Sequence, residues 1–331
     1  MKETKVHFIG FLANVDDTIL GLKLGDDFVV EKLSQKEVVP FLKRIEFHYG
    51  ASGYPEIFTQ GASPKCYCIR NDNIANFQKT EQNGVVIKIA ECENYLNNLK
   101  KKVRLLRLFQ GGNILFRFSC FYHIKNTEPS VFRIVRQWII KDRTIFTLGA
   151  AECSMAEQFI KSTKLPFTQS FLQLAFECFE LSYDAPNFGL LFLSLMMSLE
   201  TMLNVDRYEL RYRTSRNTAV LLGKSFRESE KIFKEVRGLY DKRSKLVHTG
   251  KQNAITINDV FKLRNYVRES IKEISTINKG KDKLVAMLNS SGFEKKIGLE
   301  NRSEVNKEGK VLKKKKVAKK KTIKKKAKKL T

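Results

Sequence analysis

Two residue types that act together on phosphate esters lie close to each other near the end of one amphipathic segment. The stretch "LYDKRSKLVHTG" runs from Leu239 to Gly250 and contains Arg243 and His248. Imidazole titrates near neutral pH and suits general acid–base catalysis, while guanidinium binds phosphate through paired hydrogen bonds. The pair therefore predicts proton transfer and charge stabilisation at a phosphate group. An Arg five positions before a His is expected about 0.2 times by chance in a chain of this composition. The residues around the pair must therefore show whether it is catalytic.

The helical pattern around Arg243 makes its position unusual. Val236, Tyr240, Arg243 and Val247 follow the i, i+4, i+7, i+11 spacing of one helix face, which is otherwise apolar. A guanidinium on a buried or interface-facing stripe is costly unless it meets a carboxylate or a phosphate. Glu200 is the expected internal partner, because it is the only charge in the apolar helix predicted around it. Arg216 is a second residue that could pair with Glu200.

The relation between the two candidate catalytic residues, Arg243 and His248, is left open by the sequence. His248 precedes Thr249 and Gly250, so it is expected at a helix C-terminus, where the dipole favours imidazolium. Five positions on an ideal helix mean about 140° of rotation and roughly 7.5 Å of rise, so the two side chains do not share a face. They converge only through an unwound last turn or a second copy of the helix; otherwise the Arg is structural and the His stabilises its helix end.

The elements that position this segment predict two folded parts and a tail. Residues 1–150 are expected to form a mixed α+β domain, with a β-meander over 5–31, helices near 36–47 and 90–109, and strands over 113–124, 130–140 and 143–149. Residues 151–279 have helical periodicity and short connections, which predict an all-α antiparallel bundle with helices over 151–162, 166–181, 186–203, 209–222, 229–249 and 257–277. Residues 280–331 are expected to be a disordered, basic tail.

The charge of the chain predicts a polyanionic partner. The 331 residues carry a net charge of +26, and half of it lies in the segment 307–329, where fourteen lysines face one acid, Glu308. Nucleic acid is the first expectation and an anionic membrane surface the second, because each neutralised phosphate releases counterions. The tail has no aromatic residue from Glu294 onward, so its binding would be phosphate-driven and open to DNA as well as RNA. The candidate contacts are Lys242 and Lys245 beside the motif and Lys313, Lys314, Lys315 and Lys316 in the tail.

Several other classes of protein are not expected. The six cysteines lie in apolar stretches with no signal peptide ahead of them, which predicts reduced thiols and a cytoplasmic protein. Cys66 and Cys68 share one face of a predicted strand, but no second pair of ligands completes a zinc set, and no cofactor motif occurs. Neither a metal nor a cofactor is therefore expected. The most apolar run, 188–199, is shorter than the roughly twenty residues of a membrane span, so it predicts a core helix. RNA is preferred as the partner, and no membrane is expected.

Three segments, in this order and spacing, resemble the C-terminal domain of Apea-like HEPN proteins. They are "LSLMMSLETML" over 193–203, "ELRYRTSRNTAVLLG" over 209–223 and "VRGLYDKRSKLVHTGK" over 236–251. The motif of that family is an Arg, a small polar residue and, a few positions later, a His, which here corresponds to Arg243, Ser244 and His248. The resemblance covers 188–250 and extends faintly to "VRLLRLFQGGNI" over 103–114. It departs after the His, where the family commonly has Gly and this chain has Thr249.

The resemblance implies an HEPN bundle that dimerises to form a composite, metal-independent RNA-cleaving site. His248 would act in proton transfer at the ribose 2′-hydroxyl or the leaving 5′-oxygen, and Arg243 would stabilise charge on the phosphate, with Ser244, Glu200 and Arg216 in support. The expected protein is an RNA endonuclease, a defence or toxin-like effector, acting as a homodimer whose 229–249 helices face each other. Some HEPN domains bind nucleotides or partners without cleaving, so a noncatalytic nucleic-acid-binding or regulatory protein is the alternative.

Overall fold

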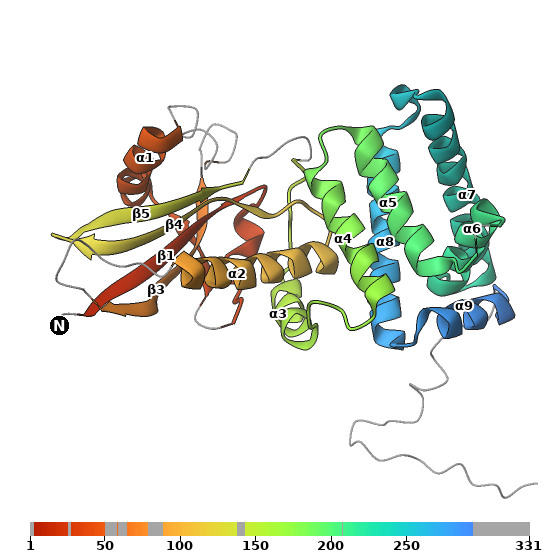
Figure 1. Cartoon of the computed structure of the whole chain (residues 1–331), viewed down its shortest axis with the longest axis horizontal. Coiled ribbons are helices and arrows are strands. Elements are labelled where there is room, and N and C mark those ends of the chain that lie inside the picture. Colours follow the sequence, from red (N-terminus) through yellow and green to blue (C-terminus); the bar gives the residue numbers. More distant parts are fainter. Residues whose placement is uncertain are drawn as a thin grey trace, which may run out of the picture.

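The described part of the chain forms a sheet-containing part and a helical part that lie side by side (Figure 1). The structure is a computed structural model and describes residues 3–25, 28–49, 58, 65–78, 89–137, 143–206 and 208–293. An α+β part followed by an all-α part is what the sequence predicts.

The N-terminal part is built on a five-stranded antiparallel sheet in the order β2-β3-β1-β4-β5. The sheet is covered on both faces, since Phe8 contacts Tyr95 of α2 and Phe11 contacts Phe41 of α1. For this reason the central strands read as nearly continuous apolar runs rather than strict alternations. The elements are β1 (Glu3–Ala13), β2 (Val29–Leu33), α1 (Gln35–Tyr49), β3 (Cys66–Gln78), α2 (Ile89–Phe109), β4 (Leu115–Lys125) and β5 (Glu128–Arg136).

Two of the predicted strands are wrong. The middle run of the expected meander, 18–24, contributes to a short 3-10 helix, η1 (Asp17–Ile19), and one isolated bridge from Lys23 to β2. The run 143–149 forms only one bridge, from Phe146 to the segment after β1. Apolar and polar residues alternate in both runs because an irregular backbone buries their apolar side chains. Sequence periodicity does not distinguish this arrangement from a strand. The buried side chains are Ile19, Leu22, Leu24, Phe146 and Leu148.

The tight connection from α2 to β4 depends on a glycine. Gly112 has a φ of +133°, and a Cβ at this position would lie 2.4 Å from the Cα of Phe146. Only glycine adopts this conformation without strain and leaves room for the neighbouring backbone. The connection brings Arg107, in the last turn of α2, against the start of β4, where its Nε donates to the carbonyl oxygen of Ile114 at 2.8 Å.

The C-terminal part is a bundle of helices around the apolar helix α5. α5 packs against α4, α6, α7 and α8, and Figure 1 shows α4 and α5 as neighbours that run in opposite directions. The six predicted helices agree with the structure to within four residues at each end. In the described chain the helices are α3 (Glu152–Ser162), α4 (Ser170–Asp184), α5 (Phe188–Leu203), α6 (Leu210–Leu222), α7 (Phe226–Thr249), α8 (Ile257–Ile277) and α9 (Lys281–Ser290).

The helical part ends later than predicted. Residues from 280 onward were expected to form a disordered tail, but α9 buries Leu284, Val285 and Leu288 against the bundle. The prediction fails because the apolar run 284–288 is short and is flanked by polar residues, so it gives a weak periodic signal, although three of its residues are buried. The lysine-rich segment 307–329 lies outside the described residues.

Phe293 anchors the end of the described chain to the first turns of α7. Its ring lies 6.1 Å from the ring of Phe226 and 6.0 Å from the ring of Phe233, measured between centroids. Its carbonyl oxygen accepts a hydrogen bond from the hydroxyl of Ser229 at 3.1 Å. The last described residue is therefore packed beside the N-terminal end of α7.

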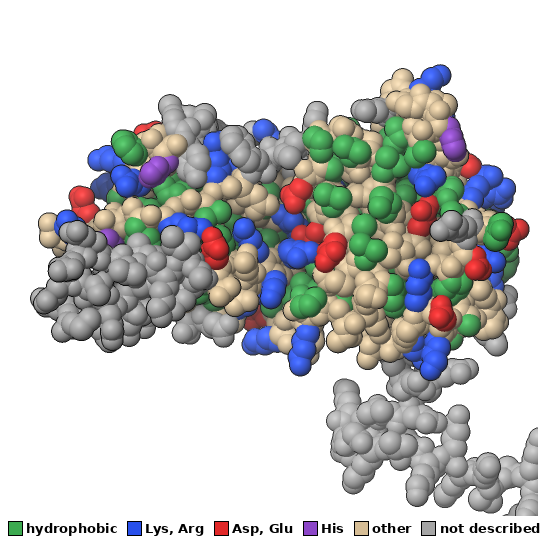
Figure 2. Space-filling model, in the orientation of Figure 1, with side chains coloured by type: hydrophobic (Ala, Val, Ile, Leu, Met, Phe, Trp, Pro, Cys, Tyr) green, Lys and Arg blue, Asp and Glu red, His purple; other side chains and the backbone are tan. Residues whose placement is uncertain are grey.

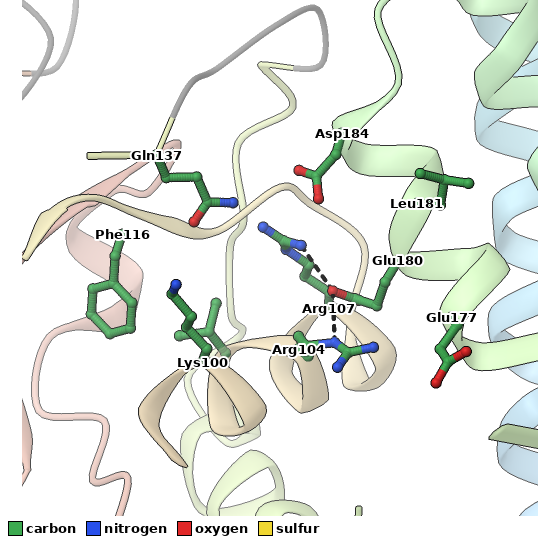
Figure 3. Close-up of a pocket in the computed structure, with 10 residues that line it drawn as sticks. Lys100, Arg104, Arg107, Phe116, Gln137, Glu177, Glu180, Leu181 and Asp184 are labelled. Atoms are coloured by element: carbon green, nitrogen blue, oxygen red, sulfur yellow. Dashed lines mark hydrogen bonds and ion pairs between the residues drawn. The ribbon is translucent and has the colours of Figure 1, made fainter. Parts of the chain in front are cut away.

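A buried ionic contact joins the two parts of the molecule (Figure 3). Arg107 of α2 is only 3% exposed, and its Nη1 donates to Oε2 of Glu180 on α4 at 2.9 Å. The Nε of Arg104 lies 3.3 Å from the same oxygen. The ring of Tyr183 lies 4.8 Å from the Cζ of Arg107 and 4.1 Å from the Cζ of Arg264 on α8. Burial raises the pKa of Glu180, and the charges of Arg107 and Arg104 oppose that rise.

Candidate functional site

Helix α7 carries both Arg243 and His248 and is capped at both ends. Ser225 accepts a hydrogen bond from a backbone N–H of the first turn. Gly250 adopts a φ of +65° and donates its N–H to the carbonyl of Leu246. The predicted glycine cap is therefore confirmed, and its left-handed backbone explains why a glycine follows Thr249. The helix is held in a defined position up to the turn that contains the histidine.

Arg243 meets the carboxylate that the sequence predicts. Its Nε lies 3.8 Å from Oε1 of Glu200 on α5, with the two side chains 29% and 20% exposed. That distance is too long for a hydrogen bond, and Oε1 of Glu200 is buried without a hydrogen-bond partner among the described residues. The Cζ of Arg243 also lies 5.6 Å from the centre of the Tyr240 ring. Arg243 is thus attracted by charge but not tied by a short directional bond to Glu200.

Tyr240 belongs to this site, although the sequence analysis treats it only as a member of the apolar stripe. Burial, followed by the charge of Glu200 and a hydrogen bond to it, raises the pKa of Tyr240 to about 12, and Arg243 opposes the rise. The phenol therefore stays protonated at neutral pH beside the Glu200 carboxylate. A Tyr three positions before an Arg on one helix face is a signal for this contact, but such residues more often belong to the core.

His248 lies apart from Arg243 within one chain. Its side chain is exposed in the last turn of α7 and has no hydrogen bond or ion pair among the described residues. Arg243, in contrast, is half-buried against α5. Because α7 is helical through Thr249, its last turn is not unwound, and five positions of one helix still place the two side chains on different sides.

The residues next to the motif differ in their roles. Ser244 is half-buried and Lys245 is exposed. Lys242 was predicted to contact nucleic acid, but its Nζ forms an ion pair with Asp259 at 2.7 Å. Burial tends to raise the pKa of Asp259, yet the hydrogen bonds from Lys242 and Thr256 leave it below its usual value. Because Asp259 is also the acid of the capping box that starts α8, Lys242 holds α7 and α8 together.

Arg216 does not have the predicted role as a partner of Glu200. Its guanidinium donates instead to three carbonyl oxygens at the end of α9, those of Leu288 at 2.8 Å, Asn289 at 3.1 Å and Ser291 at 2.7 Å. A cation at a helix C-terminus satisfies carbonyls that have no partner within the helix. Arg216 therefore attaches α9 to α6. The predicted tail contacts Lys313, Lys314, Lys315 and Lys316 lie outside the described residues.

An apolar surface on α4 and α5 leads to Glu200, and hydrophobic side chains gather over these two helices in Figure 2. This α4–α5 surface consists of Leu174, Leu181, Leu190 and Met197, which are between 47 and 57% exposed. Ser198 donates to the carbonyl of Ala175 at 2.7 Å, a contact that sets the alignment of the two helices. Along α5, Leu190, Leu193, Met197 and Glu200 follow the i, i+3, i+7, i+10 spacing of one face. Exposed apolar surface of this kind marks interaction sites.

The described residues also bear on metal and membrane binding. Within them, no three His, Cys, Asp or Glu side chains are arranged to hold a metal ion. Cys66 and Cys68 face the same buried core, as predicted, and burial raises the pKa of Cys66 to about 12 and that of Cys68 still further. Both are therefore protonated thiols rather than nucleophiles at neutral pH. No described helix combines the length and the apolar character needed to cross a bilayer.

A scan against protein-family models, a search of curated proteins and a search of solved structures found no match to this chain. The chemistry of the site therefore rests on its own residues. Arg243 offers a cation that is not tied by a short bond, and His248 offers an exposed imidazole, a group that serves as a proton acceptor or donor in catalysis. Together they suit reactions at a phosphate diester.

Proposed function

We propose that this protein is a metal-independent RNA endonuclease of the HEPN type, a defence or toxin-like effector. The observation that carries the proposal is the state of Arg243. It is half-buried and 3.8 Å from Glu200 without a hydrogen bond, five residues before an exposed histidine. The resemblance of the chain to Apea-like HEPN proteins over 188–250 supports the same reaction. The proposed compartment is the cytoplasm, where the six free thiols stay reduced.

The proposed reaction uses the ribose 2′-hydroxyl as the nucleophile. A neutral imidazole of His248 takes the proton of the hydroxyl, whose oxygen attacks the adjacent phosphorus. A protonated imidazole gives a proton to the 5′-oxygen as its bond to phosphorus breaks, so a cyclic 2′,3′-phosphate and a 5′-hydroxyl are formed. Arg243 binds the phosphate oxygens, with which guanidinium makes the paired hydrogen bonds that it lacks with Glu200.

The proposal includes a homodimer, because one chain separates Arg243 from His248. A two-fold axis near Glu200 would bring the Arg of one subunit toward the His of the other. The α4–α5 surface supports this arrangement, since it offers exposed apolar area that continues to Glu200. We therefore propose that the interface includes this surface beside the α7 helices.

The direct test is incubation of the purified protein with RNA in EDTA. We expect cleavage by the wild type and loss of cleavage in His248→Ala and Arg243→Ala. Two matched controls, His48→Ala and Arg237→Ala, remove an exposed histidine of α1 and an exposed arginine of α7 and should remain active. Full activity of His248→Ala, or no cleavage by any form of the wild type, would refute the proposal.

The composite site has its own test, the mixing of inactive variants. If each site takes its Arg from one subunit and its His from the other, Arg243→Ala mixed with His248→Ala restores part of the cleavage, because some heterodimers carry one intact pair. Leu190→Glu with Met197→Glu should yield monomers in light scattering and abolish cleavage without unfolding. A protein that is strictly monomeric at high concentration and still cleaves contradicts the arrangement.

The alternative is a noncatalytic nucleic-acid-binding or regulatory protein. It is favoured by one observation, that Arg243 already has an internal ion pair while His248 has no partner among the described residues. In that case truncation after Asn306 abolishes RNA binding, and Arg243→Ala affects only stability. RNA binding that survives the truncation would count against this alternative.

A further inference from the structure

The N-terminal part carries a polar face on α2 that the proposed cleavage site does not use. Asn94, Asn97, Asn98 and Lys101 follow the i, i+3, i+4, i+7 spacing of one helix face, and all four are exposed. Arg104 extends this face by one turn. Lys and Arg side chains are visible in Figure 2 along the course that α2 follows in Figure 1. We call residues 94–104 the α2 face.

Two hollows adjoin the α2 face. The first, of about 670 Å³, is lined by Asn94, Asn97, Asn98, Lys100, Lys101 and Arg104. The second, of about 680 Å³, lies between α2 and the end of α3, and its polar lining includes Asn71, Asn98, Lys101, Lys102 and Thr163. Among the described residues that line them, neither hollow contains a carboxylate. The cavity at the junction with α4, in contrast, includes Glu177, Glu180 and Asp184 (Figure 3).

Two cations of the α2 face, Lys100 and Lys101, are not neutralised within the described chain. Lys100 and Lys101 form no ion pair there, whereas Arg104 contacts Glu180 with its Nε. Uncompensated cations attract an anion, and a concave surface concentrates that attraction. Because the two lysines are adjacent to three asparagines, a bound anion would also meet amide groups that both donate and accept hydrogen bonds.

We propose that the α2 face binds single-stranded RNA. The lysines contact phosphates, and the asparagine amides bond to 2′-hydroxyls and base edges. Single-stranded RNA is favoured because hollows accept bases that are splayed out, which a duplex does not offer. The proposal shares its partner with the proposed function but does not depend on cleavage, since it concerns only the binding of RNA.

The test measures RNA affinity in the full chain with His248→Ala, so that the probe stays intact. Lys100→Glu with Lys101→Glu is compared with Lys36→Glu with Lys43→Glu, which makes the same charge change at exposed positions of α1, on the opposite face of the sheet. We expect about tenfold weaker binding of a labelled single-stranded oligoribonucleotide for the α2 pair, and a slope of log affinity against log salt that is lower by about two. For the α1 pair we expect the RNA affinity to change by less than about twofold.

Cross-linking locates the contact independently of affinity. A 4-thiouridine oligoribonucleotide irradiated with the same full chain should give cross-links within residues 94–104. Equal weakening by both lysine pairs, or no cross-link in this segment, overturns the proposal. Single-stranded DNA that binds the α2 face as tightly as RNA, or duplex RNA that binds it more tightly, overturns the choice of partner. Failure of cleavage in the wild type changes none of these outcomes, so the two proposals fail separately.

Discussion

The molecule contains two sets of Arg, Glu and Tyr that differ in how tightly they are held. At the junction of the two parts, Arg107 donates to Glu180 at 2.9 Å, and its Cζ lies 4.8 Å from the ring of Tyr183. In the bundle, Nε of Arg243 lies 3.8 Å from a Glu200 oxygen, and its Cζ lies 5.6 Å from the ring of Tyr240. The junction pair is almost fully buried, while Arg243 and Glu200 keep about a quarter of their side chains exposed.

The difference shows that residue type does not decide the role of an ion pair. A buried pair with a short hydrogen bond leaves an uncompensated charge if it is broken, so it resists any exchange of partner. A partly exposed pair without a hydrogen bond loses little when a phosphate replaces the carboxylate. The same three residue types thus form a structural joint around Glu180, whereas around Glu200 they leave the guanidinium of Arg243 partly accessible.

The largest expected effect is on stability at the junction. Glu180→Ala should lower the free energy of unfolding by about 3–5 kcal/mol, because Arg107 remains buried without a counter-charge. Glu200→Ala should cost about 1 kcal/mol, since water reaches Arg243. Urea unfolding of both variants measures the contrast. Replacing both junction residues with apolar ones, Arg107→Met with Glu180→Leu, is the control and should recover most of the loss. Equal losses in the two single variants would break the comparison.

The second effect is on catalysis. Arg243→Ala should lower kcat/KM for RNA about a hundredfold, the typical cost of losing one group that stabilises charge in the transition state. Its free energy of unfolding should change by only about 1 kcal/mol. Arg243→Lys keeps the charge and should recover part of the rate but not the paired hydrogen bonds. If cleavage falls in proportion to stability across a series of such variants, Arg243 is a structural residue like Arg107.

The third effect is a dependence of stability on alkaline pH. The pKa of Tyr240 is about 12 in the folded protein and about 10 in the unfolded chain. The stabilisation is therefore complete below pH 10 and is lost as the pH rises from 10 to 12, because the unfolded phenol ionises first. At pH 11 the contribution should have fallen by about 1 kcal/mol. Tyr240→Phe should remove this part of the decline in unfolding measurements from pH 9 to 11.5, and an unchanged decline would contradict the assignment.

The smallest effect is the response to salt. Raising the ionic strength from about 0.05 M to about 0.5 M should reduce the destabilisation by Glu200→Ala by a few tenths of a kcal/mol, because ions screen a partly exposed pair. The destabilisation by Glu180→Ala should remain constant, since mobile ions do not enter the junction. Unfolding curves at the two salt concentrations provide the measurement. A salt response that is larger at Glu180 would reverse the comparison.

Local patterns in the sequence were enough to predict the pairing of Arg243 with Glu200, but not the part of Tyr240. Glu200 stands alone in an apolar helix and Arg243 stands alone on an apolar stripe, so each charge marks the other as its partner. The C-terminal end of α7 and the start of α8 are also predictable, because Gly250 and Thr256 are strong capping residues. Such features depend on a few neighbouring residues, which is why they are visible without the fold.

The other set depends on contacts between distant parts of the chain. Arg107 and Glu180 are 73 positions apart, and each lies in an amphipathic helix where a charge normally faces solvent. The roles of Arg216 and Lys242 were missed for the same reason, since the partners of Arg216 are backbone carbonyls and that of Lys242 is a capping acid. Periodicity reports which face a residue occupies, but not which other element packs against that face.

The anchoring of Phe293 determines how a mechanical load would enter the bundle. A pull on the chain that follows Phe293, for example by a polyanion that holds the lysines, acts first on the contacts of this residue with Phe226, Phe233 and Ser229. These contacts lie at the beginning of a 24-residue helix about 36 Å long, and His248 lies at its other end. A load applied through Phe293 therefore meets α7 at the end of the helix opposite the imidazole.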